Sequence, residues 1–132
     1  MLLDLFENGY LINTAIFIVS DHGNQNKGIY NIINPSEFEL EMKFGTFVLL
    51  LYKDNKIIKK YENNLLNNQQ VMVTPYDIHD TMIHIIYGKN NKKIKEINSA
   101  NNKGNSVLNY IDPTERKCEK YDDWIKDFCG CF

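Results

Sequence analysis

Two unbroken apolar runs constrain the fold of this chain more than any other feature. The first lies within the "TAIFIVS" of residues 14–20, and the second lies within the "TFVLLLY" of residues 46–52. A short apolar run rich in β-branched or large side chains is typical of a buried strand. The absence of alternation indicates that both faces are covered, as in a parallel sheet. We therefore predict strands over both segments, the first as a central parallel strand.

Three helical segments are predicted around these strands. Residues 2–8 form a short amphipathic helix that "NGY" ends, and Ser36 can cap a second helix that reaches about Phe44. The third has the clearest boundaries, in "TPYDIHDTMIHIIYG". Thr74 is its N-cap, Pro75 follows at the first helical position, Asp77 can bond back to the free amides, and Gly88 ends it.

Strands separated by helical segments predict the α/β class. Residues 56–70 are polar and weakly patterned, and no element is predicted there. We divide the chain into an α/β domain over 1–88, an Asn- and Lys-rich linker over 89–106 and a Cys-containing tail over 107–132. The frequent asparagines, as in "ENNLLNNQQ", are interpreted as a bias of the coding sequence.

Composition limits the partners. The 132 residues carry a net charge of −2, which gives no reason to expect nucleic acid or an anionic membrane as a partner. No apolar run reaches the roughly 18 to 20 residues of a membrane span. The apolar N-terminus has no basic region and is interrupted by Asp4 and Glu7, so we do not expect a signal peptide in this chain.

All three cysteines lie in the tail: Cys118, Cys129 and Cys131. In an oxidising compartment one pair can close a small loop and leave one thiol over, and in a reducing one all three stay free. Three thiols without a fourth ligand nearby make a poor zinc cage. The three residues are therefore disulfide candidates, with their pairing open.

The first strand ends in "SDHG", which places a carboxylate beside an imidazole. Ligand groups gather at strand ends in α/β sheets. Asp21 and His22 can reach one ion only if the chain has left the strand, which Gly23 allows. A carboxylate and a neutral imidazole suit a borderline divalent cation. A strand-ending Asp or His that simply caps a loop is the structural alternative.

Three segments in the same order resemble one protein family. "NTAIFIVSDHG" resembles the Asn-Thr, apolar run, Ser-Asp-His-Gly strand of the alkaline phosphatase and sulfatase superfamily. "TPYDIHDTMIHIIYG" is similar to the Thr-Pro-aromatic-Asp-Ile-His helix of its sulfatase-like branch DUF229, and "ERKCEKYDDWIKDFCGCF" is similar to the Arg-x-Cys … Cys-x-Cys ending of that branch.

The resemblance implies the C-terminal part of an alkaline-phosphatase-like sheet flanked by helices. It also implies that Asp21 and His22 bind one divalent metal, Zn²⁺ or one of Ca²⁺, Mg²⁺ and Mn²⁺. That metal would polarise a phosphoryl or sulfuryl oxygen of a small ester substrate and help to ionise the nucleophile. Lys27 is the nearest candidate for a substrate clamp. The family further implies a secretory or extracellular location.

The chain departs from the family pattern, in which the nucleophile and the first metal-binding acids lie upstream. Only twenty residues precede Asp21, and none offers a nucleophile that opens a helix. We therefore expect no catalytic residue here, and a C-terminal hydrolase fragment that is inactive alone, its partner being the missing N-terminal half of the fold. The alternatives are a degenerate structural or interaction module, or an unrelated small α/β domain.

The other candidate ligands have structural interpretations. His79 and His84 are five residues apart, so they do not share a helix face, and a core or surface role is expected for each. Asp77 is expected to be a helix cap rather than a ligand.

Overall fold

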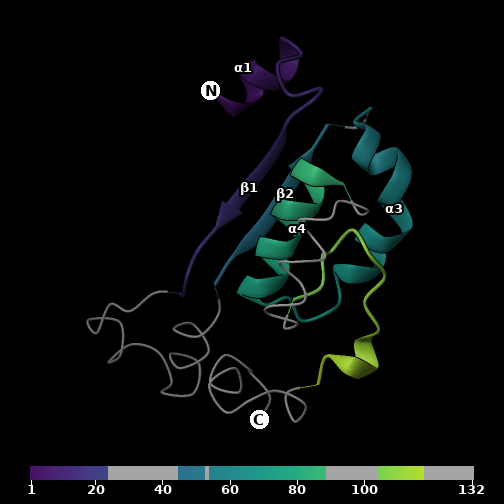
Figure 1. The fold of residues 1–132 in the computed structure, drawn as a ribbon. Coiled ribbons are helices and arrows are strands. Elements are labelled where there is room, and N and C mark those ends of the chain that lie inside the picture. The colour runs from purple at the N-terminus through teal and green to yellow at the C-terminus, as the bar shows by residue number, and fades with distance from the viewer. Residues whose placement is uncertain (24–44, 53, 89–103, 118–132) are drawn as a thin grey trace, which may run out of the picture. The chain divides into compact units, whose positions relative to one another are not determined.

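The computed structural model describes residues 1–23, 45–52, 54–88 and 104–117, and these form a small α/β structure (Figure 1). Two compact units divide the chain. Among the described residues, the first unit contains helix α1 (Leu2–Glu7) and strands β1 (Ala15–Val19) and β2 (Phe47–Leu51). The second contains helices α3 (Lys56–Asn68) and α4 (Pro75–Tyr87) and the 3₁₀ turn η1 (Pro113–Glu115).

β1 and β2 form a two-stranded antiparallel ladder, with Ala15 opposite Leu51 and Val19 opposite Phe47. Both strands lie where the apolar runs predict them, shorter by one residue at each end. The prediction of a parallel central strand is wrong for the described sheet. An unbroken apolar run reports that neither face carries a polar side chain, but it does not encode the direction of the neighbouring strand.

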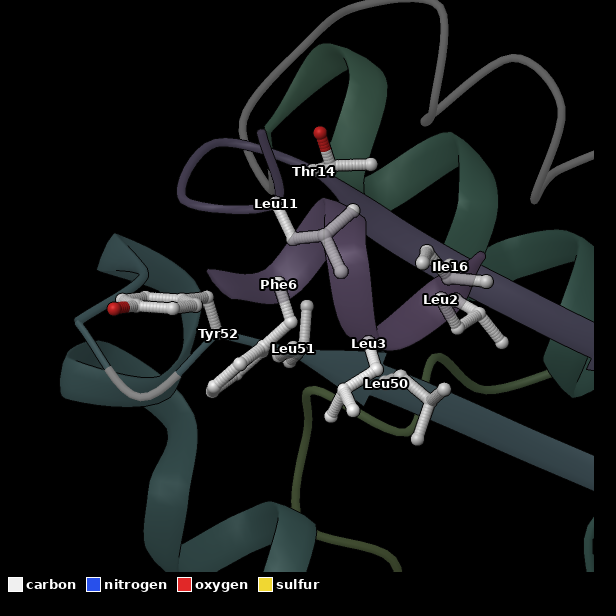
Figure 2. Close-up of a pocket in the computed structure, with 9 residues that line it drawn as sticks. All are labelled: Leu2, Leu3, Phe6, Leu11, Thr14, Ile16, Leu50, Leu51 and Tyr52. Atoms are coloured by element: carbon white, nitrogen blue, oxygen red, sulfur yellow. The ribbon is translucent and has the colours of Figure 1, made fainter. Parts of the chain in front are cut away.

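The predicted N-terminal helix is confirmed as α1, which ends at Glu7. It lines an apolar cavity of about 260 Å³ together with both strands (Figure 2). Phe6 on α1 and Tyr52 after β2 face each other there, with ring centroids 5.0 Å apart. The walls are formed by Leu2, Leu3, Phe6, Leu11, Thr14, Ile16, Leu50, Leu51 and Tyr52. No described residue of this unit is fully buried.

α3 occupies the segment for which no element is predicted, so that expectation is wrong. The Asn55 side chain caps the helix by accepting a hydrogen bond from the Ile57 amide at 2.9 Å. Apolar residues recur at helical spacing in this segment, at Ile57, Ile58, Tyr61 and Leu65. This pattern predicts a helix, but the many polar residues between them make it hard to see. The second predicted helix, from Ser36 to Phe44, lies outside the described residues.

α4 confirms the helix predicted from its boundary residues. Thr74 is the N-cap, and its side chain and that of Asp77 form a reciprocal capping box. Pro75 begins the helix, and Gly88 follows Tyr87 with a φ of +74°. The sequence therefore specifies both ends of α4 locally.

The buried apolar residues of the second unit come mostly from a segment that has no α-helix or strand and only the 3₁₀ turn η1. We call residues 104–117 the clasp; its trace runs beside α3 and α4 (Figure 1). Val107, Leu108 and Ile111 of the clasp are exposed by only 4%, 1% and 2%, and Val71 completes the set. No helix in the described ranges is long and apolar enough to span a membrane.

Candidate functional site

The ladder continues one residue beyond β1 before the chain turns away. The Ser20 amide donates a hydrogen bond to the Thr46 carbonyl at 2.8 Å. Gly45 passes close to this point, since a Cβ added there would lie 2.5 Å from the Ser20 carbonyl oxygen. Glycine is therefore required for the two segments to approach, and Asp21 is the first residue outside the ladder.

Asp21 and His22 lie side by side after β1, as the motif predicts. The Asp21 Oδ2 and His22 Nε2 atoms are 3.5 Å apart, and the two side chains are 86% and 42% exposed. The other Asp21 oxygen, Oδ1, accepts the His22 amide at 3.0 Å. The Ser20 hydroxyl donates to the His22 carbonyl. Local hydrogen bonds thus orient the carboxylate and leave Oδ2 facing the imidazole.

The second ring nitrogen of His22 fixes the tautomer. Nδ1 lies 2.8 Å from the Gly23 carbonyl oxygen, which can only accept, so Nδ1 carries the hydrogen. Nε2 then carries the lone pair of the neutral ring, and in the protonated ring it carries a hydrogen and forms an ion pair with Asp21 Oδ2. Two electron-rich atoms that face each other are stabilised by a cation between them, and histidines that ligate metals typically donate their other N–H to a carbonyl in this way.

The spacing of these two atoms is that of a His–Asp ion pair and is also compatible with a shared metal ion. Two ligand atoms at the usual Zn–N and Zn–O bond lengths in tetrahedral geometry lie about 3.3 Å apart. The observed 3.5 Å separation of Oδ2 and Nε2 is close to that value. Within the described ranges, no third His, Cys, Asp or Glu joins the pair to complete a cluster. Asp21 and His22 therefore stand as a pair among the described residues, and not as a cluster of three or more candidate ligands.

The remaining candidates from the sequence lie apart or are not described. Lys27 and the three cysteines, Cys118, Cys129 and Cys131, lie outside the described residues. His79 is on the exposed side of α4, with Nδ1 3.1 Å from Oδ1 of Asp80. His84 is buried, so the two histidines of α4 occupy different faces, as their spacing predicts.

Asp77 has a second partner that the capping motif does not predict. Its carboxylate is completely buried and forms a bidentate ion pair with Arg116, at 2.9 Å for each N–O contact. The Thr74 amide and hydroxyl donate to Oδ2 at 2.7 and 2.8 Å, and the Asn105 amide donates to Oδ1 at 2.7 Å. The cap prediction is confirmed, and the saturated carboxylate acts as a structural anchor.

His84 bridges α3 and the clasp. Its Nε2 lies 3.2 Å from the Tyr61 hydroxyl, and its Nδ1 lies 3.0 Å from the Ser106 hydroxyl. The Ser106 oxygen also accepts the Leu108 amide at 3.2 Å. Sequence analysis did not identify Tyr61, Ser106 or Arg116, because no local spacing relates them to α4. A histidine on the apolar face of a helix is the signal that points to buried polar partners.

Comparison with known proteins gives one family. A family model described as "Protein of unknown function (DUF229)" matches residues 1–132. Neither the curated proteins nor the solved structures contain a match to this chain.

Proposed function

Because the chain belongs to the DUF229 family, we propose that it carries part of the metal site of a metal-dependent phosphate- or sulfate-ester hydrolase. In this proposal β1 and β2 belong to an alkaline-phosphatase-like sheet, which the missing N-terminal half of the fold completes. The observation that carries the proposal is the pair formed by Asp21 Oδ2 and His22 Nε2, 3.5 Å apart at the end of β1.

The chain's own groups hold and orient the metal ligands. Asp21 Oδ1 is held by the His22 amide, and the His22 ring is held through Nδ1 by the Gly23 carbonyl. These contacts limit the rotation of both side chains and reduce the entropy lost when a cation binds. A divalent cation at this point supplies Lewis acidity toward a phosphoryl or sulfuryl oxygen.

Catalysis needs more than these two residues. A catalytic zinc site normally has three protein ligands, and this pair supplies two. The nearest hydroxyl in the sequence, that of Ser20, donates to the His22 carbonyl. We propose that the remaining ligands and the nucleophile come from other residues of a complete hydrolase, so this chain alone turns over neither an aryl phosphate nor an aryl sulfate.

Metal binding by the full chain tests the proposal. Isothermal titration with Zn²⁺ and Mn²⁺ compares the unaltered chain, the double variant D21N/H22Q and the control H79Q/D80N. The control removes the adjacent His–Asp pair of α4, which also has a close N–O contact of 3.1 Å. We expect D21N/H22Q to weaken binding by about tenfold or more, and the control to leave it unchanged.

The outcomes separate the proposal from its alternative. If both double variants bind as the unaltered chain does, the metal site is wrong and a non-catalytic module of the same fold is favoured. If binding depends on Asp21 and His22, the metal site stands. Any hydrolysis of either ester by this chain would contradict its inactivity alone, and hydrolysis that persists in a chelator would also contradict the dependence on metal.

A further inference from the structure

The clasp supplies a hydrophobic core to two helices. Val107, Leu108 and Ile111 are three of the four buried apolar residues in the described part of the chain. α3 and α4 meet directly where Tyr61 and His84 make an edge-to-face ring contact, with centroids 5.3 Å apart. Removing the clasp would expose the apolar faces that it covers, so the helix pair depends on it for burial.

One asparagine of α3 binds the clasp main chain at three positions. The Asn68 Nδ2 atom donates to the carbonyls of Val107 and Asn109, at 2.8 and 2.7 Å. Its Oδ1 atom accepts the Ile111 amide at 3.2 Å. Asn68 is 4% exposed, so these hydrogen bonds form in the interior. They satisfy clasp main-chain groups that a neighbouring strand would satisfy in a sheet.

Two further asparagines continue this recognition along the same helix face. The Asn64 Nδ2 atom donates to the Leu108 carbonyl at 2.8 Å, and the Asn67 Nδ2 atom donates to the Ile111 carbonyl at 3.1 Å. Positions 64, 67 and 68 have the spacing that places side chains on one face of a helix. This face therefore binds main-chain groups of the clasp, four carbonyls and the Ile111 amide, which every peptide segment offers.

α4 binds the clasp amides. The Thr81 hydroxyl accepts the Val107 amide at 2.9 Å and donates to the Asp77 carbonyl at 2.6 Å. Asp77 Oδ1 accepts the Asn105 amide at 2.7 Å. α3 binds four clasp carbonyls and the Ile111 amide, and α4 binds the Asn105 and Val107 amides, so the two helices together satisfy both kinds of main-chain group of one segment.

The two ends of the clasp fix its register. At Gly104, an added Cβ would lie 2.5 Å from the Tyr76 carbonyl oxygen, so glycine alone fits there. At the other end, the Arg116 guanidinium forms the bidentate pair with Asp77, and the two side chains are 9% and 0% exposed. A slip by one residue would break both contacts and leave a buried charge unpaired.

We propose that the joint face of α3 and α4 is a receptor for a peptide main chain, and that its ligand is the chain's own clasp. Clasp and helices fold as one cooperative unit, and the Asp77–Arg116 pair sets the register of docking. The asparagines on this face of α3, Asn64, Asn67 and Asn68, then bind the clasp and are not explained by a bias of the coding sequence alone. This inference does not depend on the metal site.

Amide hydrogen exchange of the full chain under native conditions tests the proposal without a substitution. The Asn105, Val107 and Ile111 amides, which bond to helix side chains, are compared with the amides in the middle of α4. If the clasp unfolds together with the helices, both sets of amides exchange through the same unfolding event. Their protection factors then lie within about tenfold of each other. Clasp amides that exchange about a hundredfold faster than those of α4 would overturn the proposal.

A matched pair of substitutions on α3 gives the second test. Asn68→Ala removes the buried contacts, while Asn63→Ala changes an exposed residue of the same type in the same helix. Asn→Ala favours the helix inside α3, at Asn63, at least as much as at its last residue, Asn68, so the two variants are compared for the clasp contacts that only Asn68 makes. We expect N68A to lower protection in clasp and α4 alike by about 10- to 100-fold relative to N63A. A loss confined to the clasp, or none, would contradict cooperative folding.

Discussion

The two units use apolar residues in opposite ways. In the first unit, the strands are nearly all apolar, yet Ile18, Val19 and Leu50 are 43%, 48% and 40% exposed. In the second unit, α3 is rich in asparagine, yet Asn68 is 4% exposed and lies beside the buried Leu108. Burial here follows from whether a segment has a partner that fits it, and not from its hydrophobicity alone.

The same contrast separates what each unit can do. The first unit places exposed polar groups, Asp21 and His22, at the end of a ladder, where a ligand can reach them. The second unit places its polar groups inside, with Asp77 at 0% exposure and fully paired. Exposed and unsaturated groups suit binding, whereas buried and saturated groups suit structural specificity. Metal titration therefore tests the site in the first unit, whereas measurements of unfolding free energy test the polar groups of the second unit.

The largest effect is expected for Arg116→Gln. It leaves the buried Asp77 carboxylate without its cation, and breaking one side of a buried ion pair costs about 3–5 kcal/mol of unfolding free energy. Urea denaturation followed by circular dichroism measures the loss. Lys117→Gln, at an exposed neighbouring position, is the control and is expected to change stability by less than about 0.5 kcal/mol. Equal effects from the two would contradict the role of the pair.

The second prediction compares two leucines of the same unit. Leu108 is 1% exposed, and Leu108→Ala is expected to cost about 2–4 kcal/mol through lost burial and the cavity that remains. Leu66 is 57% exposed on α3, and Leu66→Ala is expected to cost less than about 0.5 kcal/mol. Thermal and urea unfolding measure both. A small cost at Leu108 would mean that the clasp is not part of the core.

A smaller effect is expected at the N-cap of α4. Thr74→Ala removes the hydroxyl that donates to Asp77 at 2.8 Å and should cost about 1–2 kcal/mol. Thr74→Ser keeps that hydroxyl and is expected to recover most of the loss. Urea midpoints of the two variants make the comparison. If T74S is as unstable as T74A, the methyl group rather than the cap carries the effect.

The smallest effect is expected in the first unit. Leu3 lines the apolar cavity but is 67% exposed, so Leu3→Ser should change unfolding free energy by less than about 0.5 kcal/mol. A loss above about 2 kcal/mol would show that the α1 surface is buried in solution, and the contrast between the units would then be wrong. The same urea titration measures it.

Local features of the sequence specify the two strands, α1 and α4. Apolar runs mark strands because β-branched and large apolar side chains fit the pleated surface of a sheet. Thr74, Asp77 and Gly88 mark α4 because caps are local interactions. The adjacent Asp21 and His22 are visible in the same way. Their 3.5 Å contact follows from the turn that the chain makes after the ladder.

Other features required the tertiary structure. Strand direction, the burial of Asn68 and the pairing of Asp77 with Arg116, 39 residues along the chain, each depend on contacts between distant segments. Sequence periodicity indicates which side chains are buried, but it does not indicate which residues far along the chain pack against them. The amino-acid sequence by itself determined the two strands, α1, α4 and the adjacent Asp–His pair. Only the tertiary structure decided that a polar helix and an irregular clasp form the core, because their hydrogen bonds join residues some forty positions apart.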